Sequence, residues 1–270
     1  MSKTILITGS TDGIGLATAR LFVEGGHHVI LHGRNPAKLK EAEQTLASLP
    51  GANGVSGIVA DLSRLEDVAS LAQAISARNT RLDVLINNAG VLKLPDPITP
   101  SGLDARFVVN TLAPHHLTRL LMPLLGADSR VLNLSSAAQA PVNPAAMTGQ
   151  KHLSDMEAYA QSKLALTMWS RQMASELGPD GPTMIAVNPG SLLASKMVKD
   201  GFGVAGNDIG IGAEILHRLA LDPEYGDATG LYFDNDIGRI GPPHPDATND
   251  AKCREITKQI DALIDRLASN

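Results

Sequence analysis

Two polar side chains of this chain have the spacing of an acid–base pair. Tyr159 and Lys163 are four positions apart, so a helix would place them on the same face. A free phenol has a pKa of about 10, too high for efficient proton exchange near neutrality, and a nearby ammonium group would lower it. The pair is therefore a candidate for general acid–base catalysis, although ordinary surface or packing pairs often have the same spacing.

A glycine-rich turn near the N-terminus predicts a dinucleotide-binding loop. An apolar run at 5–7 leads into Thr8-Gly-Ser-Thr-Asp-Gly-Ile-Gly15, after which apolar residues recur at helical spacing. A helix that begins there presents unpaired backbone N–H groups and partial positive charge, which suit a pyrophosphate. The glycine spacing is not that of the general G-x-G-x-x-G fingerprint, so a purely structural turn is the alternative.

The rest of the chain alternates strands with helices, and this order predicts how these residues are positioned. Ser63, with Glu66 three residues later, predicts a capped helix that carries an apolar stripe from Leu65 to Ile75. The other expected helices cover about 36–49, 101–125, 155–177, 209–221 and 250–267. The expected strands cover about 5–7, 28–31, 55–60, 82–86, 130–134, 183–187 and 231–233.

This alternation predicts an α/β fold, in which 1–270 form a single Rossmann-type domain. We expect a doubly wound parallel sheet of about seven strands with helices on both faces. The irregular segments at 137–154 and 195–207 follow strands at the ends where open α/β sheets bind ligands. We predict a substrate lid at 191–208, with a surface loop as the alternative, and a C-terminal extension with a terminal helix at 234–270.

Five motifs, taken together, resemble those of the short-chain dehydrogenase/reductase family. They are the glycine turn, Asn87-Asn-Ala-Gly90, Ser136, Tyr159-Ala-Gln-Ser-Lys163 and Asn188-Pro-Gly190. Each motif alone is common, but all five occur in order, each at the expected end of its element. The resemblance covers about 3–197, and Gly33-Arg-Asn35 is similar to the retinol-dehydrogenase-like branch, as is the long stretch between Ser136 and Tyr159.

The resemblance implies an oxidoreductase that interconverts an alcohol and a carbonyl by hydride transfer. It implies four catalytic residues, which are Asn110, Ser136, Tyr159 and Lys163. In the family the tyrosine exchanges a proton with the substrate oxygen, while the lysine tunes the tyrosine and holds the nicotinamide ribose. The serine orients the substrate oxygen and the asparagine supports a water relay to the lysine. Ser135 is the neighbouring alternative to Ser136, and a buried asparagine at a helix kink is the alternative for Asn110.

The cofactor contacts implied by the resemblance lie after the strands. From the glycine turn they are Thr8, Gly9, Ser10, Thr11, Asp12, Gly13, Ile14 and Gly15. Further along the chain they are Arg34, Asp61, Leu62, Asn88, Ala89, Gly90, Tyr159, Lys163, Pro189, Gly190, Leu192 and Ser195. Asp61 would hydrogen-bond adenine, cap the helix that follows, or do both. Ser195 would replace, with one residue inserted, a threonine that the family carries after Pro-Gly.

The end of the second strand favours NADP over NAD. An NAD-binding chain would carry Asp or Glu there to bind the ribose 2′-hydroxyl, whereas this chain reads Leu31-His-Gly-Arg34-Asn. Arg34 can pair with a 2′-phosphate, so we expect NADPH to be preferred over NADH; the alternative is a solvated turn arginine. The glycine turn lacks the basic residue that many NADP-preferring relatives carry.

Composition excludes several other function classes. A net charge of −5 argues against a nucleic-acid partner, which would need a basic face. Cys253 is the only cysteine, so no intrachain disulfide can form, which suits a reducing and cytoplasmic location. We see no secretory signal and no apolar run near the roughly 18 residues of a membrane span. The pairs His27-His28 and His115-His116 lack zinc-site spacing, so we expect no metal.

The expected partners are a small-molecule alcohol or carbonyl and further copies of this chain. The helix that carries Tyr159 also carries Trp169 and is apolar on more than one face. Such a helix often packs against its mate in the family, which predicts a homodimer or homotetramer; burial by the chain's own C-terminal segment is the alternative. Apolar residues in the pocket segments suit an apolar substrate. The alternative function is a non-catalytic NADP-binding redox sensor or scaffold.

Overall fold

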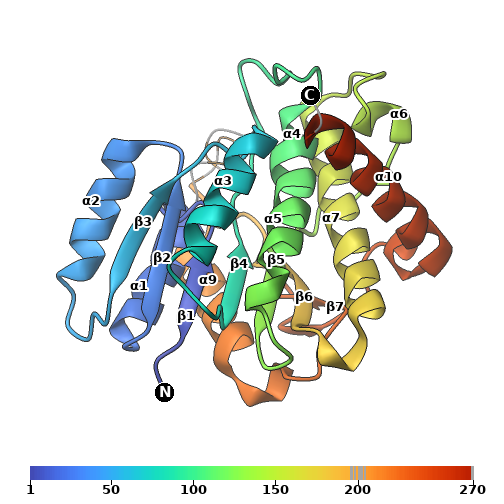
Figure 1. The fold of residues 1–270 in the computed structure, drawn as a ribbon. Coiled ribbons are helices and arrows are strands. Elements are labelled where there is room, and N and C mark those ends of the chain that lie inside the picture. The colour runs from blue at the N-terminus through green and yellow to red at the C-terminus, as the bar shows by residue number, and fades with distance from the viewer. Residues whose placement is uncertain (195–196, 198, 200–202, 204, 269–270) are drawn as a thin grey trace.

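One sheet of eight strands runs through the centre of the computed structural model, which describes residues 1–194, 197, 199, 203 and 205–268 (Figure 1). The strands lie in the order β3-β2-β1-β4-β5-β6-β7-β8. They span β1 Thr4–Ile7, β2 His28–Gly33, β3 Val55–Val59, β4 Val84–Asn87, β5 Arg130–Leu134, β6 Thr183–Asn188, β7 Leu231–Asp234 and β8 Arg239–Ile240. The predicted parallel sheet is confirmed, and the short β8, which pairs antiparallel with β7, extends it.

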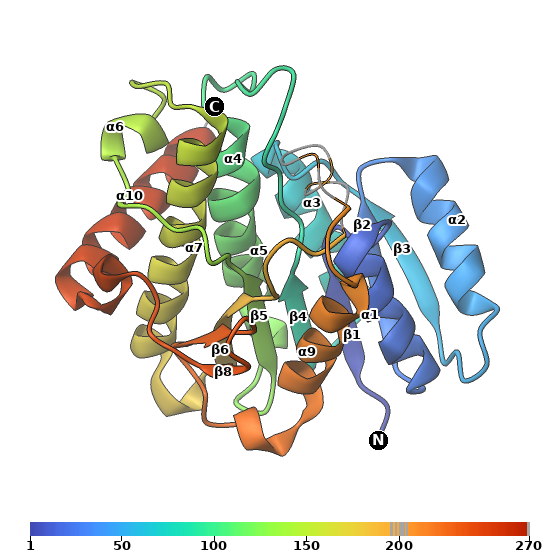
Figure 2. The same ribbon diagram turned by 180° about the vertical axis from the view of Figure 1, so that it is seen from behind.

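Helices cover both faces of the sheet (Figures 1 and 2). The helices α1 (Gly13–Glu24), α2 (Pro36–Ala47) and α9 (Ile209–Leu221) lie on one face. The other face carries α3 (Leu65–Ser76), α5 (Ala113–Leu121) and α7 (Asp155–Leu177). Shorter helices are α4 (Ala105–Phe107) and α6 (Pro144–Met147), and α10 (Asp250–Ala268) packs on the outside of α7.

The central strands β1, β4, β5 and β6 are mostly apolar because both of their faces are buried. Leu6 of β1 belongs to the core under α3, α5 and α7, whereas Ile5 and Ile7 belong to the core under α1 and α9. This alternation follows from the opposite orientation of successive side chains in a strand. The order of the strands reverses between β1 and β4, and the crevice outside their carboxyl ends is where open sheets of this kind bind ligands.

The start of α3 differs from the sequence prediction. Arg64, not Ser63, is the N-cap residue, and it makes no side-chain capping bond. The Ser63 hydroxyl instead donates to the carboxylate of Asp61 over 2.8 Å. The predicted capping box is therefore wrong, because a local turn at Asp61 takes up the serine.

The helical segment expected at 101–125 is interrupted by a single π-helical turn. Between α4 and α5 lies Val108–Leu112, and the Ala113 N–H donates to the Val108 carbonyl, five residues earlier. A 3-10 turn at Met122–Leu124 ends the segment. Turns of π-helix are found often at functional sites, and this one contains Asn110.

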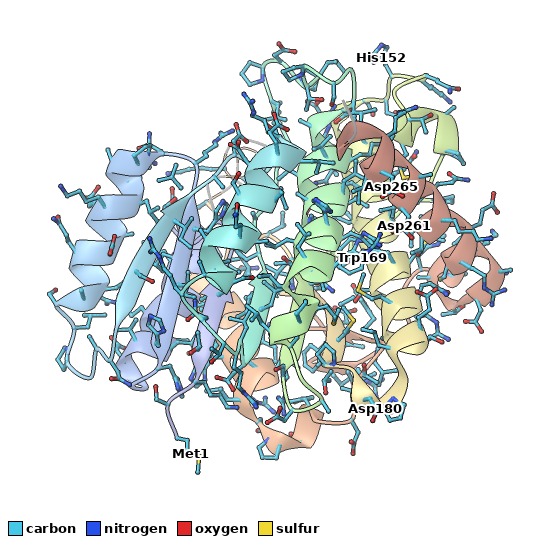
Figure 3. The ribbon with its side chains drawn as sticks, viewed as in Figure 1. Met1, His152, Trp169, Asp180, Asp261 and Asp265 are labelled. Atoms are coloured by element: carbon cyan, nitrogen blue, oxygen red, sulfur yellow. The ribbon has the colours of Figure 1, made fainter. Side chains whose placement is uncertain are left out.

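The outer side of α7 is covered by α10, as Figures 1 and 3 show. Asp261 of α10 accepts a hydrogen bond of 2.6 Å from Arg119 of α5. Beneath this contact Trp169 is fully buried, and its ring stands perpendicular to that of His115 with centroids 5.1 Å apart. Trp169 is thus a core residue, and the apolar surface of α7 meets the chain's own C-terminal helix. Within the described residues, no helix is both long and apolar enough to cross a membrane.

Candidate active site

The conformation of the glycine turn between β1 and α1 requires residues without a β-carbon. Gly9 and Gly13 have φ values of 64° and 58°, a region that favours glycine. A β-carbon at Gly15 would lie 2.4 Å from the Gly9 carbonyl oxygen, so α1 can begin directly against the turn only with glycine there. The Asp12 carboxylate accepts the N–H of Gly13, while the N–H groups of Ile14 and Gly15 have no acceptor among the described residues. These free donors face the end of α1 where an anion would bind.

A buried histidine braces the same turn from β2. The Gly9 N–H donates to Nδ1 of His32 over 3.1 Å, and Nε2 of His32 lies 3.1 Å from the Ala60 carbonyl oxygen. Nδ1 must therefore be the unprotonated nitrogen. Ser10 is also buried, its hydroxyl donates to the Ile7 carbonyl, and its N–H donates to the His32 carbonyl. His32 and Ser10 thus hold the turn in place from below.

This brace predicts a specific pH dependence of stability. Burial lowers the pKa of His32 to about 4, below its ordinary value of 6.5. Between these values the unfolded chain binds more protons than the folded one, so acidification from pH 6.5 to 4 should cost up to about 3 kcal/mol. His32→Gln keeps a donor and an acceptor but does not titrate. Denaturant unfolding across this range should show a shallower loss in His32→Gln, and equal slopes would contradict the assignment.

Thr8 and Asn88 join the glycine turn to the segment after β4. The N–H groups of Asn88 and Ala89 each donate to the Thr8 hydroxyl over 3.0 Å. In return, the Asn88 side-chain amide donates to the carbonyls of Thr8 and Gly9 over 2.8 and 3.0 Å. These reciprocal bonds place the two cofactor segments expected from the sequence directly beside each other.

Asn110 holds the chain just beyond Gly90. Its side-chain carbonyl accepts the Val91 N–H over 2.8 Å, and its amide donates to the Val91 carbonyl and the Ser162 hydroxyl over 2.9 and 3.0 Å. A β-carbon at Gly90 would lie 3.4 Å from both Asn110 Oδ1 and Lys163 Nζ. Asn110 is therefore next to Lys163 but makes its own hydrogen bonds elsewhere.

The two serines after β5 have different surroundings. Ser135 is buried, and its hydroxyl lies 2.7 Å from that of Thr167 on α7. Ser136 is only partly buried; its hydroxyl accepts the Ala138 N–H over 3.1 Å and interacts with Tyr159, whose pKa it lowers. Of the two candidates, Ser136 is thus the one that meets the tyrosine.

Lys163 and Tyr159 lie together on α7, as their spacing predicts. Lys163 is buried, its Nζ donates to the Leu134 carbonyl at the end of β5 over 2.6 Å, and this nitrogen is 5.7 Å from the centre of the Tyr159 ring. Burial lowers the pKa of Lys163 to about 8. Burial also raises the pKa of Tyr159, and the hydrogen bond with Ser136 opposes this rise only in part. The expected lowering of the Tyr159 pKa is therefore wrong here, because burial outweighs it and the ammonium group points to Leu134.

Arg34, Asp61 and Leu62 are the residues that the sequence predicts to bind the adenosine half of a dinucleotide. Arg34 directly follows β2, is exposed, and has no hydrogen bond or ion pair to the described residues. Lys38 of α2 lies nearby, 3.9 Å from the Asp12 carboxylate. One oxygen of Asp61 accepts the N–H and hydroxyl of Ser63, which leaves the other oxygen available. Leu62 is buried.

Hydrogen bonds hold the segment after β6 as far as the base of the predicted lid. The Asn235 amide donates to the Pro189 carbonyl over 2.9 Å, and Gly190 has a φ of 122°. Leu192 has a φ of 53°, which is unusual for a residue with a side chain and is common near functional sites. Asn207 exchanges backbone hydrogen bonds of 2.7 Å with Leu192 and Ala194, which closes the base of the predicted lid. Ser195 and most of 195–204 lie outside the described residues.

Sequence reasoning missed three side chains that shape this site. They are His32, Gln139 and Tyr232, whose hydrogen bonds reach the glycine turn or Ser136. A histidine within the apolar run of β2 was the available signal for His32. Gln139 and Tyr232 gave no comparable signal, because their partners lie in segments that only the fold brings together.

The arrangement fits a dinucleotide with a reactive nicotinamide. The glycine turn offers unpaired N–H groups and an approach without side chains, whereas Ser136, Tyr159 and Lys163 lie together at the end of β5, with Lys163 next to Gly90. The crevice thus carries a candidate anion site at the glycine turn and candidate proton-transfer groups at the end of β5.

Comparisons with known proteins agree with this geometry. Residues 3–202 match the model of the family described as short chain dehydrogenase. Human retinol dehydrogenase 13 is 29% identical over 288 residues, which cover 97% of this chain and 84% of that protein. An uncharacterized protein from Mycobacterium paratuberculosis has a TM-score of 0.80 at 26% identity, with 97% of this chain and 93% of that chain covered. A protein of Escherichia coli CFT073, described as a short chain dehydrogenase complexed with NADPH, has a TM-score of 0.70 at 28% identity, with 86% and 96% covered.

Proposed function

Because the chain belongs to the short-chain dehydrogenase family, we propose that it is an NADP-dependent oxidoreductase that interconverts an alcohol and a carbonyl. The resemblance to the retinol-dehydrogenase-like branch is confirmed by the similarity to human retinol dehydrogenase 13. The observation that carries the proposal is that Ser136, Tyr159 and Lys163 lie together at the end of β5, with Lys163 next to Gly90. A binding protein without catalysis would not need this set of groups.

Each residue of the site has a distinct task in this proposal. When bound, the nicotinamide supplies or accepts the hydride at the substrate carbon. Tyr159 is protonated at neutral pH, so its hydroxyl would donate the proton that a carbonyl oxygen takes up during reduction. Ser136 donates a second hydrogen bond to that oxygen and orients it. Lys163, beside Gly90, holds the ribose. Asn110 holds the neighbouring backbone at Val91.

The glycine turn and its neighbours would hold the rest of the cofactor. The free N–H groups of Ile14 and Gly15 would bind the pyrophosphate, and Asp61 would bind the adenine. Ala89 and Gly90 leave room for the nicotinamide half. Pro189, Gly190 and Leu192 would border it from the side of β6.

The preference for NADPH depends on Arg34. Its guanidinium group is exposed and has no partner among the described residues, so it is available to a 2′-phosphate. The Escherichia coli structure, described as a complex with NADPH, supports this choice of cofactor.

Arg34→Glu should reverse this preference. A hydrogen bond to a charged group contributes about 1.5–3 kcal/mol, so NADPH binding should weaken roughly 10- to 150-fold while NADH binding stays the same or improves. Fluorescence titration with each cofactor measures both constants. Lys40→Glu makes the same change of charge at an exposed site within α2 and should leave the ratio unaltered. An unchanged ratio in Arg34→Glu would remove Arg34 from the phosphate site.

The substrate that we propose is a small, apolar alcohol or carbonyl. Apolar residues of the segments after β5 and β6 would line its pocket, and the name of the relative retinol dehydrogenase 13 makes retinal a reasonable member of a test panel. Assembly as a dimer or tetramer is also proposed, through a surface other than the face of α7 that α10 covers.

The proposed function is tested by titration of the purified protein with NADPH and NADH, followed by a panel of aldehydes and ketones on the same sample. Tight NADPH binding with turnover of a panel member is the expected result. Binding without turnover of any member would favour a redox sensor or scaffold. Binding of neither cofactor would contradict the assignment of the glycine turn.

A further inference from the structure

The backbone carbonyl of Ser136 receives hydrogen bonds from two side chains outside the catalytic set. The Gln139 amide donates to it over 2.9 Å, and the Tyr232 hydroxyl donates to it over 3.1 Å. One donor comes from the loop after β5 and the other from β7, nearly a hundred residues later in the chain. The peptide group that follows Ser136 is thus fixed from two directions.

Both donors are themselves held rigidly. Tyr232 is 5% exposed and lies in β7, where it pairs with Ala186 of β6, so the sheet determines where its phenol points. Gln139 accepts the N–H of His244 over 3.3 Å, which connects its amide to the C-terminal extension. The extension and the last parallel strand therefore reach the loop that carries Ser136.

We propose that Tyr232 and Gln139 are positioning residues that hold Ser136 in its catalytic orientation. Ser136 follows β5 and no longer belongs to the strand, so strand pairing does not fix its peptide group. A shift of the Ser136 backbone would carry the hydroxyl away from Tyr159, and a misplacement of about 1 Å can cost up to about a hundredfold in rate. Two donors on the Ser136 carbonyl oppose this shift. The inference rests on the proposed function, because it concerns the same catalytic serine.

The test compares Tyr232→Phe with wild-type protein in carbonyl reduction by NADPH. Loss of one hydrogen bond should lower kcat about 3- to 10-fold and leave the NADPH dissociation constant unchanged. The pH profile gives a second readout that a merely structural role would not move. The hydrogen bond with Ser136 lowers the pKa of Tyr159, so a displaced serine should move the alkaline limb of the kcat profile to higher pH. Tyr232→Phe combined with Gln139→Met should enlarge both effects.

Tyr225→Phe is the matched control. Tyr225 is also buried, and its hydroxyl accepts a hydrogen bond of 2.8 Å from Arg218, away from Ser136. This variant should lose comparable stability but keep the wild-type kcat and pH profile. If Tyr232→Phe, like Tyr225→Phe, keeps the wild-type kcat and pH profile, the positioning role is overturned. If the wild-type protein reduces no carbonyl at all, the proposed function itself fails, which is a separate result seen before any variant is made.

Discussion

Tyr159→Phe should abolish turnover and leave NADPH binding intact. The substitution removes only the phenolic oxygen, which is the group that we propose transfers a proton to the substrate. General acid–base catalysis of this kind contributes roughly 10²- to 10⁴-fold, so kcat should fall by that factor. Titration with NADPH, followed by steady-state reduction of the best panel substrate, measures both quantities.

Ser135→Ala is the matched control for this experiment. Its hydroxyl is buried against Thr167, so its loss should affect stability more than chemistry. Ser136→Ala, by contrast, should lower kcat, because that hydroxyl meets Tyr159. Turnover of Tyr159→Phe at the wild-type rate would contradict the role of Tyr159, and equal losses in the two serine variants would contradict the choice of Ser136.

The sequence predicts the alternation of strands and helices and the place of the polar groups because both follow local rules. Strands covered on both faces are apolar runs, and glycine or polar residues directly after them mark the carboxyl edge. Tyr159 and Lys163 needed only helical periodicity to be placed on one face. These features are encoded within a few residues, so they can be recognised before the chain is folded.

The remaining features depend on contacts between distant segments. The brace of Gly9 by His32 spans 23 residues, and the bond from Tyr232 to Ser136 spans 96. The pKa of Tyr159 depends on burial, which the Tyr-x-x-x-Lys spacing does not contain. The prediction that Ser63 caps α3 was wrong for a local reason, since Ser63 had a nearer acceptor in Asp61.

Gly15→Ala should weaken NADPH binding strongly. The new β-carbon would lie 2.4 Å from the Gly9 carbonyl oxygen and 2.5 Å from the Asn88 amide nitrogen. Neither atom can yield easily, because that amide is bound to the carbonyls of Thr8 and Gly9. Overpacking of this kind costs about 1–3 kcal/mol, which corresponds to roughly 5- to 150-fold in the dissociation constant if the turn must be restored on binding.

Comparison of binding with thermal unfolding separates the two interpretations of the glycine turn. Gly126→Ala serves as the control, since its β-carbon would meet only the end of Asp128 at 3.4 Å. Loss of NADPH affinity in Gly15→Ala well below its melting temperature would mean that the turn is a pyrophosphate site. A lowered melting temperature with wild-type affinity would mean that the turn only connects β1 to α1, because a site that binds through backbone N–H groups cannot tolerate their displacement.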